Sequence, residues 1–196
     1  MPLPTYDKTK RKQTFQQLPK GAYVVVIKNA KEVANKSGVG THLEIAFDIA
    51  EGEYKGFYMA QFENSTSEDK KYSWDAYYYL NVPDDNSKPY VWDNWNTFFA
   101  DLEDSNNGFV FTGELQSLKG KLIGGKFHIE QTESNGNVYD HTRLRFTCVA
   151  DAVRQGKYGK LPNDKLIQAS GPARVAPSDP TGFMDIPEGS DVEVPW

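Results

Sequence analysis

The chain has 196 residues, of which 38% are apolar and 25% charged, and it contains one cysteine, 11 prolines and 16 glycines. This composition is typical of one soluble globular domain, and it excludes a disulfide scaffold and a four-cysteine zinc site. No apolar run approaches the roughly 18 residues that cross a membrane, and residues 1–17 lack the apolar core of a signal peptide. We therefore expect a cytoplasmic protein that does not associate with membranes, with Cys148 as a small core residue.

The charges are distributed unevenly along the chain. The formal net charge of -5 by itself disfavours a nucleic-acid partner. However, residues 1–20 carry five basic side chains against Asp7, whereas residues 170–196 carry Arg174 against five acids. The region after Ala169 also holds five prolines and three glycines, which leave no room for a packed element. We predict a basic N-terminal arm (1–20), a folded domain (21–165) and a flexible acidic tail (166–196).

Strand patterns dominate the first part of the folded domain. A β-branched run from Ala22 predicts a first strand, and strict alternation over residues 42–49 predicts a second. The alternation assigns two faces, with Leu43, Ile45, Phe47 and Ile49 buried and with His42, Glu44, Ala46 and Asp48 in solvent. A turn at 51–56 and the run 57–62 predict a third strand, so that residues 42–63 would form a hairpin. The segment Tyr72 to Leu80 fits a strand or a short helix equally well.

The second part of the domain begins with a helix pattern. After Pro89, apolar residues recur at helical spacing up to the stop signal Asn107-Gly108, and we expect this stripe to lie in the core: Val91, Trp92, Trp95, Phe98, Phe99 and Leu102. Strands are then predicted over 124–131, with Phe127 and Ile129 inward, and over 138–149, with Leu144, Phe146 and Cys148 inward. Residues 134–137 supply the hairpin turn between them.

The order of elements is therefore three strands, a helix and two strands. This order predicts a mainly β protein with an OB-fold, a five-stranded barrel that has a helix between strands three and four and that binds oligonucleotides or oligosaccharides. A β-sandwich is the competing fold, but it would need about seven strands and no central helix.

Aromatic and basic side chains are the candidate ligand-binding groups. Tyr54 and Tyr58 are the first candidates for stacking on bases, and Trp74 and Tyr77 are further candidates because the helix stripe does not include them. Arg143 and Arg145 alternate with Leu144 and Phe146 and should share the outer face of the last strand, while Lys126 lies on the preceding strand. We expect these three cations to contact phosphates.

Catalytic signals are weak. His42, His128 and His141 have no metal-ligand spacing, and the chain has no nucleophile elbow, P-loop or dinucleotide fingerprint. We therefore expect no enzyme activity, no cofactor and no metal site. The acid-rich region 84–114 leaves a metal-dependent nuclease as a less favoured alternative.

The last residues form a distinctive peptide. Asp191 and Glu193 interleave with apolar residues, and Val194, Pro195 and Trp196 follow. An exposed tryptophan flanked by acids suits an apolar pocket with a basic rim on a partner protein. We predict that this tip recruits a partner.

Four stretches of the chain resemble a known family: PKGAYVVVIKNAKEV, LEIAFDIAEGEYKGFY, FTGELQSLKGKLIGGKF and RLRFTCVADAVRQGKY. They are similar, over about residues 18–165, to the OB-fold single-stranded DNA-binding proteins that phages and prophages of Gram-positive bacteria encode. The tip is similar to that of bacterial single-stranded DNA-binding proteins, which recruit replication and repair enzymes, but it has Trp196 in place of phenylalanine and fewer acids.

These observations predict a protein of phage DNA replication or recombination, located in the cytoplasm of the bacterial host. It would bind single-stranded DNA with little sequence preference and recruit replication or recombination proteins through its tip. The oligomeric state is left open, a homo-oligomer included. The alternative from another class is an OB module that binds carbohydrate or protein.

Overall fold

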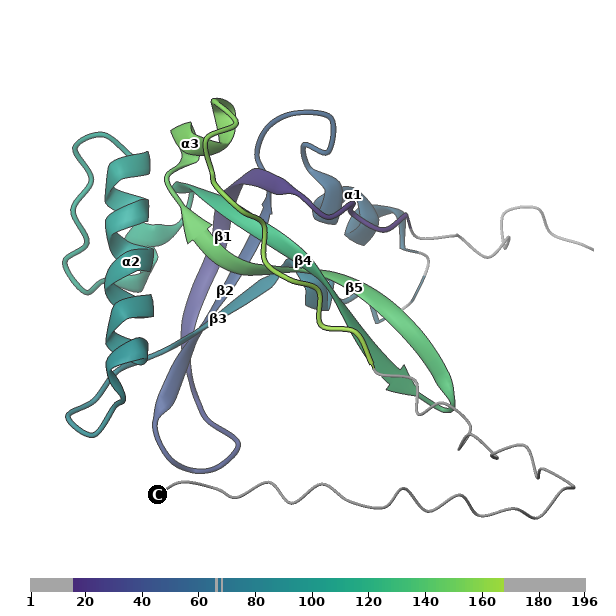
Figure 1. Ribbon diagram of the computed structural model, residues 1–196, viewed down its shortest axis with the longest axis horizontal. Coiled ribbons are helices and arrows are strands. Elements are labelled where there is room, and N and C mark those ends of the chain that lie inside the picture. The colour runs from purple at the N-terminus through teal and green to yellow at the C-terminus, as the bar shows by residue number, and fades with distance from the viewer. Residues whose placement is uncertain (1–15, 66, 68, 168–196) are drawn as a thin grey trace, which may run out of the picture.

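A computed structural model describes residues 16–65, 67 and 69–167, which form one antiparallel sheet accompanied by helices (Figure 1). The strands are β1 (Ala22–Ala34), β2 (Thr41–Ile49), β3 (Tyr77–Asn81), β4 (Leu122–Ser134) and β5 (Asn137–Cys148). The helices are α1 (Phe57–Asn64), α2 (Pro89–Ser105) and α3 (Ala150–Arg154), with 3₁₀ turns η2 (Trp74–Ala76) and η3 (Leu115–Leu118). The prediction of five strands, with a helix between the third and the fourth, is confirmed, but the fold is mixed α/β and not mainly β as predicted.

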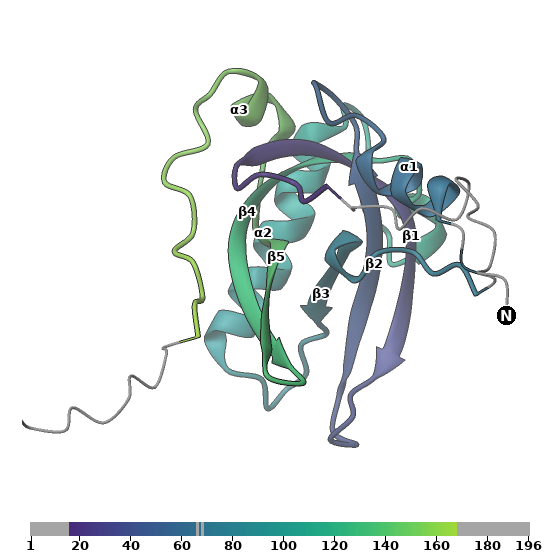
Figure 2. The same ribbon diagram turned by 90° about the vertical axis from the view of Figure 1, so that its right-hand side faces the viewer.

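The central strand of the sheet is β1, in the order β3-β2-β1-β4-β5. Residues 22–26 of β1 pair with β4, and residues 25–34 pair with β2. The sheet curls around this shared strand, so that its two edge strands, β3 and β5, come close to each other (Figure 2). Among the described residues, β3 and β5 are not joined by a backbone ladder, and the sheet is therefore open where a closed barrel was predicted.

The apolar core lies inside the curl of the sheet. The predicted inner face of β2 is buried as expected, at Leu43, Ile45, Phe47 and Ile49. Helix α2 packs against β3, β4 and β5 and contributes Phe98, Phe99 and Leu102 to the core. Leu18 is also buried, so the packed region extends into the segment predicted as an arm.

The predicted third strand is wrong, because residues 57–64 form helix α1 and no hairpin spans 42–63. The cause lies in Asp48, which was placed in solvent but is 1% exposed. Its carboxylate accepts hydrogen bonds from the backbone N–H groups of Tyr58 (3.0 Å) and Met59 (3.2 Å). These bonds satisfy donors in the first turn of α1, which would otherwise be orphaned. The third strand is instead β3, formed by the end of the ambiguous segment Tyr72 to Leu80.

Three other burial assignments are wrong. Trp92 of the helix stripe is 43% exposed, and Phe146 of the last strand is 46% exposed. Ala46, placed in solvent, is buried. Phe146 is exposed because the ladder between β4 and β5 slips by one residue, which changes the face that the following side chains occupy.

Candidate nucleic-acid interface

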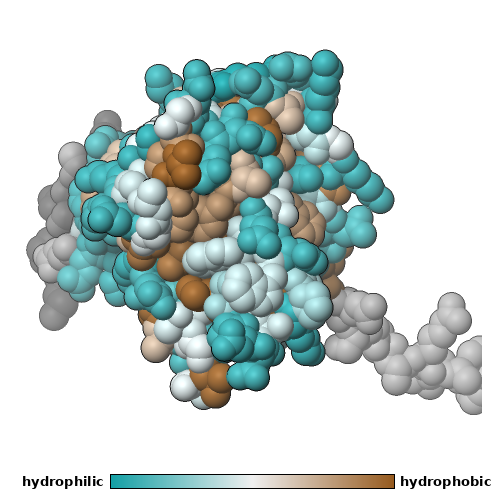
Figure 3. Space-filling view, turned by 90° about the vertical axis from the view of Figure 1, so that its left-hand side faces the viewer, coloured by the Kyte–Doolittle hydropathy of each residue, from teal (hydrophilic) through white to brown (hydrophobic). Residues whose placement is uncertain are grey.

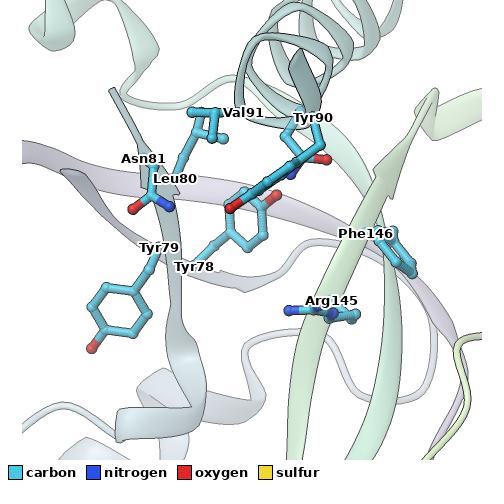
Figure 4. Close-up of a pocket in the computed structure, with 9 residues that line it drawn as sticks. Tyr78, Tyr79, Leu80, Asn81, Tyr90, Val91, Arg145 and Phe146 are labelled. Atoms are coloured by element: carbon cyan, nitrogen blue, oxygen red, sulfur yellow. The ribbon is translucent and has the colours of Figure 1, made fainter. Parts of the chain in front are cut away.

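A groove lies where β3 and β5 approach each other, and we call it the β3–β5 groove. It has a volume of about 230 Å³ and is lined by residues of three elements: Tyr78, Tyr79, Leu80 and Asn81 of β3, Tyr90, Val91 and Asn94 of α2, and Arg145 and Phe146 of β5. The groove exists because the sheet curls without closing, which leaves the edges of β3 and β5 on either side of the start of α2. Figure 4 shows Tyr78 and Tyr90 converging on this gap, with Arg145 reaching toward it from β5.

The β3 side of the groove presents aromatic rings to solvent. Tyr77 and Tyr79 lie on the same face of β3, and their rings are nearly parallel, with centroids 6.4 Å apart and planes at 23°. Tyr79 is 44% exposed, and Tyr90 at the start of α2 is also exposed. Burial raises the pKa of Tyr79, which keeps its phenol neutral further into alkaline pH. These rings offer flat apolar surface next to water, which is the requirement for stacking on a planar ligand.

The β5 side of the groove presents a cation. The register passes from Lys126 opposite Phe146 to Phe127 opposite Leu144, so Arg145 is the extra residue of a β-bulge. Arg145 is exposed, and its guanidinium points toward β3 (Figure 4). Its charge acts on Tyr78, opposing the larger rise in the pKa of that phenol caused by burial. An exposed guanidinium beside aromatic rings can bind a phosphate through two parallel hydrogen bonds, that is, in a bidentate manner.

The second predicted arginine has a different environment. Arg143 lies within 3.5 Å of both Asp75, in η2, and Glu130, on β4. Asp75 also lies 3.1 Å from Nδ1 of His141, whose Nε2 is 2.9 Å from the Thr132 hydroxyl. This cluster connects the segment before β3 to β5 across the open side of the sheet. Arg143 is therefore largely neutralised by neighbouring acids, and Arg145 is the better phosphate ligand.

The structure does not bring all predicted site residues together. Tyr58 is wrong as a stacking residue, because it lies on α1, is 2% exposed and has no free ring face. Tyr54 packs edge-on against Tyr23 (5.8 Å) and Phe57 (6.1 Å), away from the β3–β5 groove. Trp74 is the most exposed of the predicted aromatics, at 70%, and lies in η2 next to β3 without lining the groove.

Lys126 lies on the α2 side of β4. Its charge acts on Asp101 and Cys148, where burial is the larger effect and raises both pKa values. Lys126 does not line the β3–β5 groove. Burial of the Cys148 thiol also disfavours the thiolate, which agrees with a packing role for this residue.

The groove includes residues that sequence reasoning did not select, above all Tyr79, Tyr90 and Phe146. Tyr79 could have been found from strand alternation with Tyr77, had residues 77–81 been recognised as a strand. Tyr90 precedes the predicted helix stripe, which begins at Val91, and no role was predicted for it. Phe146 was assigned to the core because a β-bulge has no signal in a single sequence.

Within residues 16–65, 67 and 69–167, no group of three or more His, Cys, Asp or Glu side chains is placed to hold a metal ion. No described helix is long and apolar enough to cross a membrane. The predicted partner-binding residues Asp191, Glu193, Val194, Pro195 and Trp196 lie outside the described part of the chain. Figure 3 shows the α2 side, where an apolar patch lies within a largely polar surface.

No protein-family model matches the chain, and no curated protein shows significant sequence similarity to it. The resemblance to phage single-stranded DNA-binding proteins therefore stays a prediction.

Proposed function

We propose that this protein binds single-stranded DNA through the β3–β5 groove and acts without catalysis in phage DNA replication or recombination. The observation that carries the proposal is the juxtaposition in this groove of exposed aromatic rings on β3 and α2 with the exposed guanidinium of Arg145 on β5. Stacking platforms beside backbone-neutralising cations are the usual means of holding single strands.

The strand connectivity supports an OB-type barrel as the fold behind this function. Strands β1, β2 and β3 form a meander, α2 follows, and β4 and β5 extend the sheet on the other side of β1. Pairing of β3 with β5 is the single contact that would close the five strands into a barrel. The groove lies along this contact, at the third strand, where OB-folds bind oligonucleotides.

The proposed contacts explain tolerance of sequence. Tyr79 would stack on a base at the outer rim of the groove, on the side of β3 away from Arg145 (Figure 4), and Arg145 would hold a phosphate on the β5 side. Every base has a π-face, and a phosphate carries no sequence information, so neither contact selects a base. The acidic tip at Glu193 to Trp196 would recruit replication or recombination proteins of the bacterial host, in whose cytoplasm the protein would act.

The test measures binding of a fluorescein-labelled oligo-dT by anisotropy at low salt, about 50 mM. We expect Tyr79→Ala to weaken binding about tenfold, because one stacked base contributes about 1 to 3 kcal/mol. Trp92→Ala is the matched control, because Trp92 is 43% exposed against 44% for Tyr79 and does not line the groove.

Salt dependence separates stacking from charge. Each phosphate contact to a single strand contributes about 0.7 to the slope of log K against log salt. Arg145→Ala should lower this slope by about that amount, whereas Arg154→Ala, which removes a cation paired with Glu51 (2.6 Å), should not. Absence of wild-type binding at low salt would refute the proposal. Degradation of the oligonucleotide in Mg²⁺ would favour the nuclease instead.

A further inference from the structure

Phe146 lies at the junction of two cavities. It lines the β3–β5 groove, but Figure 4 shows its ring on the side of β5 that is away from β3. This placement follows from the bulge at Arg145, after which two consecutive side chains of β5 are exposed. The Phe146 ring is 46% exposed and lies beside the exposed Arg145, so apolar ring surface and a cation meet solvent at the same place.

The second cavity lies on the far side of Arg145 and Phe146 and has a volume of about 430 Å³. These two residues border it on one side. His128 and Glu130 of β4 and residues of the segment 162–165 complete its lining. The two cavities are therefore adjacent, because both are lined by Arg145 and Phe146.

The outer wall of the second cavity is held firmly. Lys165 pairs with β4 in parallel fashion, donating its N–H to the Ile129 carbonyl (2.9 Å) and accepting from the Gln131 N–H (2.9 Å). Nδ1 of His128 lies 3.0 Å from the Asn163 carbonyl oxygen. The segment 162–165 is thus fixed as an additional edge on β4, and the cavity is preformed.

The charges around the second cavity suit a phosphodiester chain. The Arg145 guanidinium carbon lies 5.5 Å from the centroid of the Phe146 ring, within the range of a cation–π contact. Glu130 is the carboxylate of the cavity, and it is neutralised by Lys165 at 2.6 Å and by Arg143 at 3.5 Å. A hydrogen bond from Lys165 lowers the pKa of Glu130. The Lys165 side chain remains 73% exposed, so its ammonium can also reach a phosphate.

We propose that the second cavity is a further nucleotide subsite, in which a base stacks on Phe146 while Arg145 holds the phosphate between this base and the one in the β3–β5 groove. The single strand would thus cross β5 at the bulge. This inference rests on the proposed function. It adds Phe146 as a binding residue, and it gives the path of the single-stranded DNA across β5.

The experiment compares Phe146→Ala with the wild type over a length series of labelled oligo-dT, from roughly 4 to 16 nucleotides, the range that one OB-fold covers. We expect Phe146→Ala to weaken binding of the longer oligonucleotides about tenfold, the loss of one stacked base. Oligonucleotides short enough to occupy the β3–β5 groove alone should be weakened much less. Phe146→Trp should retain the affinity, because indole also stacks.

Trp92→Ala serves again as the matched control, and thermal unfolding checks that each variant is folded. If Phe146→Ala binds every length as the wild type does, while Tyr79→Ala is weakened, the second subsite is refuted and the proposed function stands. If the wild type binds no length, the proposed function itself fails. Retained affinity in Phe146→Ala with loss in Phe146→Trp would also overturn the inference.

Discussion

Two groups of aromatic residues in this protein have similar composition and opposite surroundings. One, which we call the inner cluster, packs beneath α1 and consists of Tyr23, Phe47, Tyr54, Phe57, Tyr58 and Phe127. The other lines the β3–β5 groove with Tyr79, Tyr90 and Phe146. In the inner cluster neighbouring rings meet edge to face, with centroids 5.2 to 6.1 Å apart, so the rings pack against one another. In the groove the ring faces meet solvent.

The difference shows what separates a core aromatic from a binding aromatic. Edge-to-face packing uses the quadrupole of each ring for contacts within the protein. The groove residues lie at a strand edge or at the start of α2, so Tyr79, Tyr90 and Phe146 stay 44% to 58% exposed although Tyr77 and Arg145 contact two of the rings. Tyrosine content alone does not distinguish the two roles; the backbone around each residue does.

Among the variants that test this comparison, Tyr58→Ala should lower the free energy of unfolding the most. Removing a fully buried ring should cost about 3 to 5 kcal/mol in the free energy of unfolding, because the cavity left behind cannot be filled. Tyr79→Ala should cost less than about 0.5 kcal/mol, since an exposed side chain contributes little to stability. Urea denaturation measures both, and equal costs for the two variants would remove the distinction between the clusters.

A smaller loss is expected for Asp48→Ala, which removes the acceptor that holds α1 over the inner cluster. The buried carboxylate accepts from three backbone N–H groups, of Ile49, Tyr58 and Met59. Leaving these donors unsatisfied should cost about 2 to 4 kcal/mol. Glu44→Ala is the matched control on the same strand, because Glu44 forms a half-exposed pair with Lys31 (2.7 Å) and should cost below about 1 kcal/mol. A similar loss in both variants would contradict this role for Asp48.

The sequence predicted the fold well where the hydrophobic pattern was regular. The alternation from Leu43 to Ile49 and the helical spacing from Val91 to Leu102 each identified an element. The pattern failed where one polar group overrode it. The pattern of residues 57–62 predicts a strand, but the carboxylate of Asp48 on β2 caps a helix there. A contact between two separate elements cannot be inferred from the local sequence pattern.

The candidate site was predicted only in part, for a related reason. Tyr77 and Arg145 were selected and do lie at or beside the groove, since their residue types suit a nucleic acid wherever they are exposed. Tyr58 was selected wrongly, because its exposure depended on the wrong assignment of its element. Phe146 was missed because one extra residue in β5 reverses the face of every later side chain, and only the register with β4 reveals this.

The walls of the groove can be tested through Asp75→Ala. Asp75 connects the segment before β3 to His141 and Arg143 of β5. Its loss should cost about 1 kcal/mol, the contribution of a half-buried charged hydrogen bond, and should also weaken oligonucleotide binding by loosening the two walls. Asp151→Ala removes the partner of Arg154 in a surface pair whose aspartate is 65% exposed, and should change neither property. Unchanged binding in Asp75→Ala would show that the cluster does not position the groove.

Alkaline pH tests the tyrosines that pack in and around the inner cluster. Burial, followed by the charges of Tyr54 and Glu53, raises the pKa of Tyr23 from 10.0 to about 12, and burial raises the pKa values of Tyr58 and Tyr72 as well. The unfolded chain releases these protons near pH 10, whereas the folded protein retains them. Stability should therefore be full below pH 10 and fall as the pH rises toward 12. Tyr23→Phe removes one of these linked protons and should make the decline shallower. Tyrosinate absorbance measured alongside circular dichroism tests this, and titration of all tyrosines near pH 10 in a folded protein would contradict it.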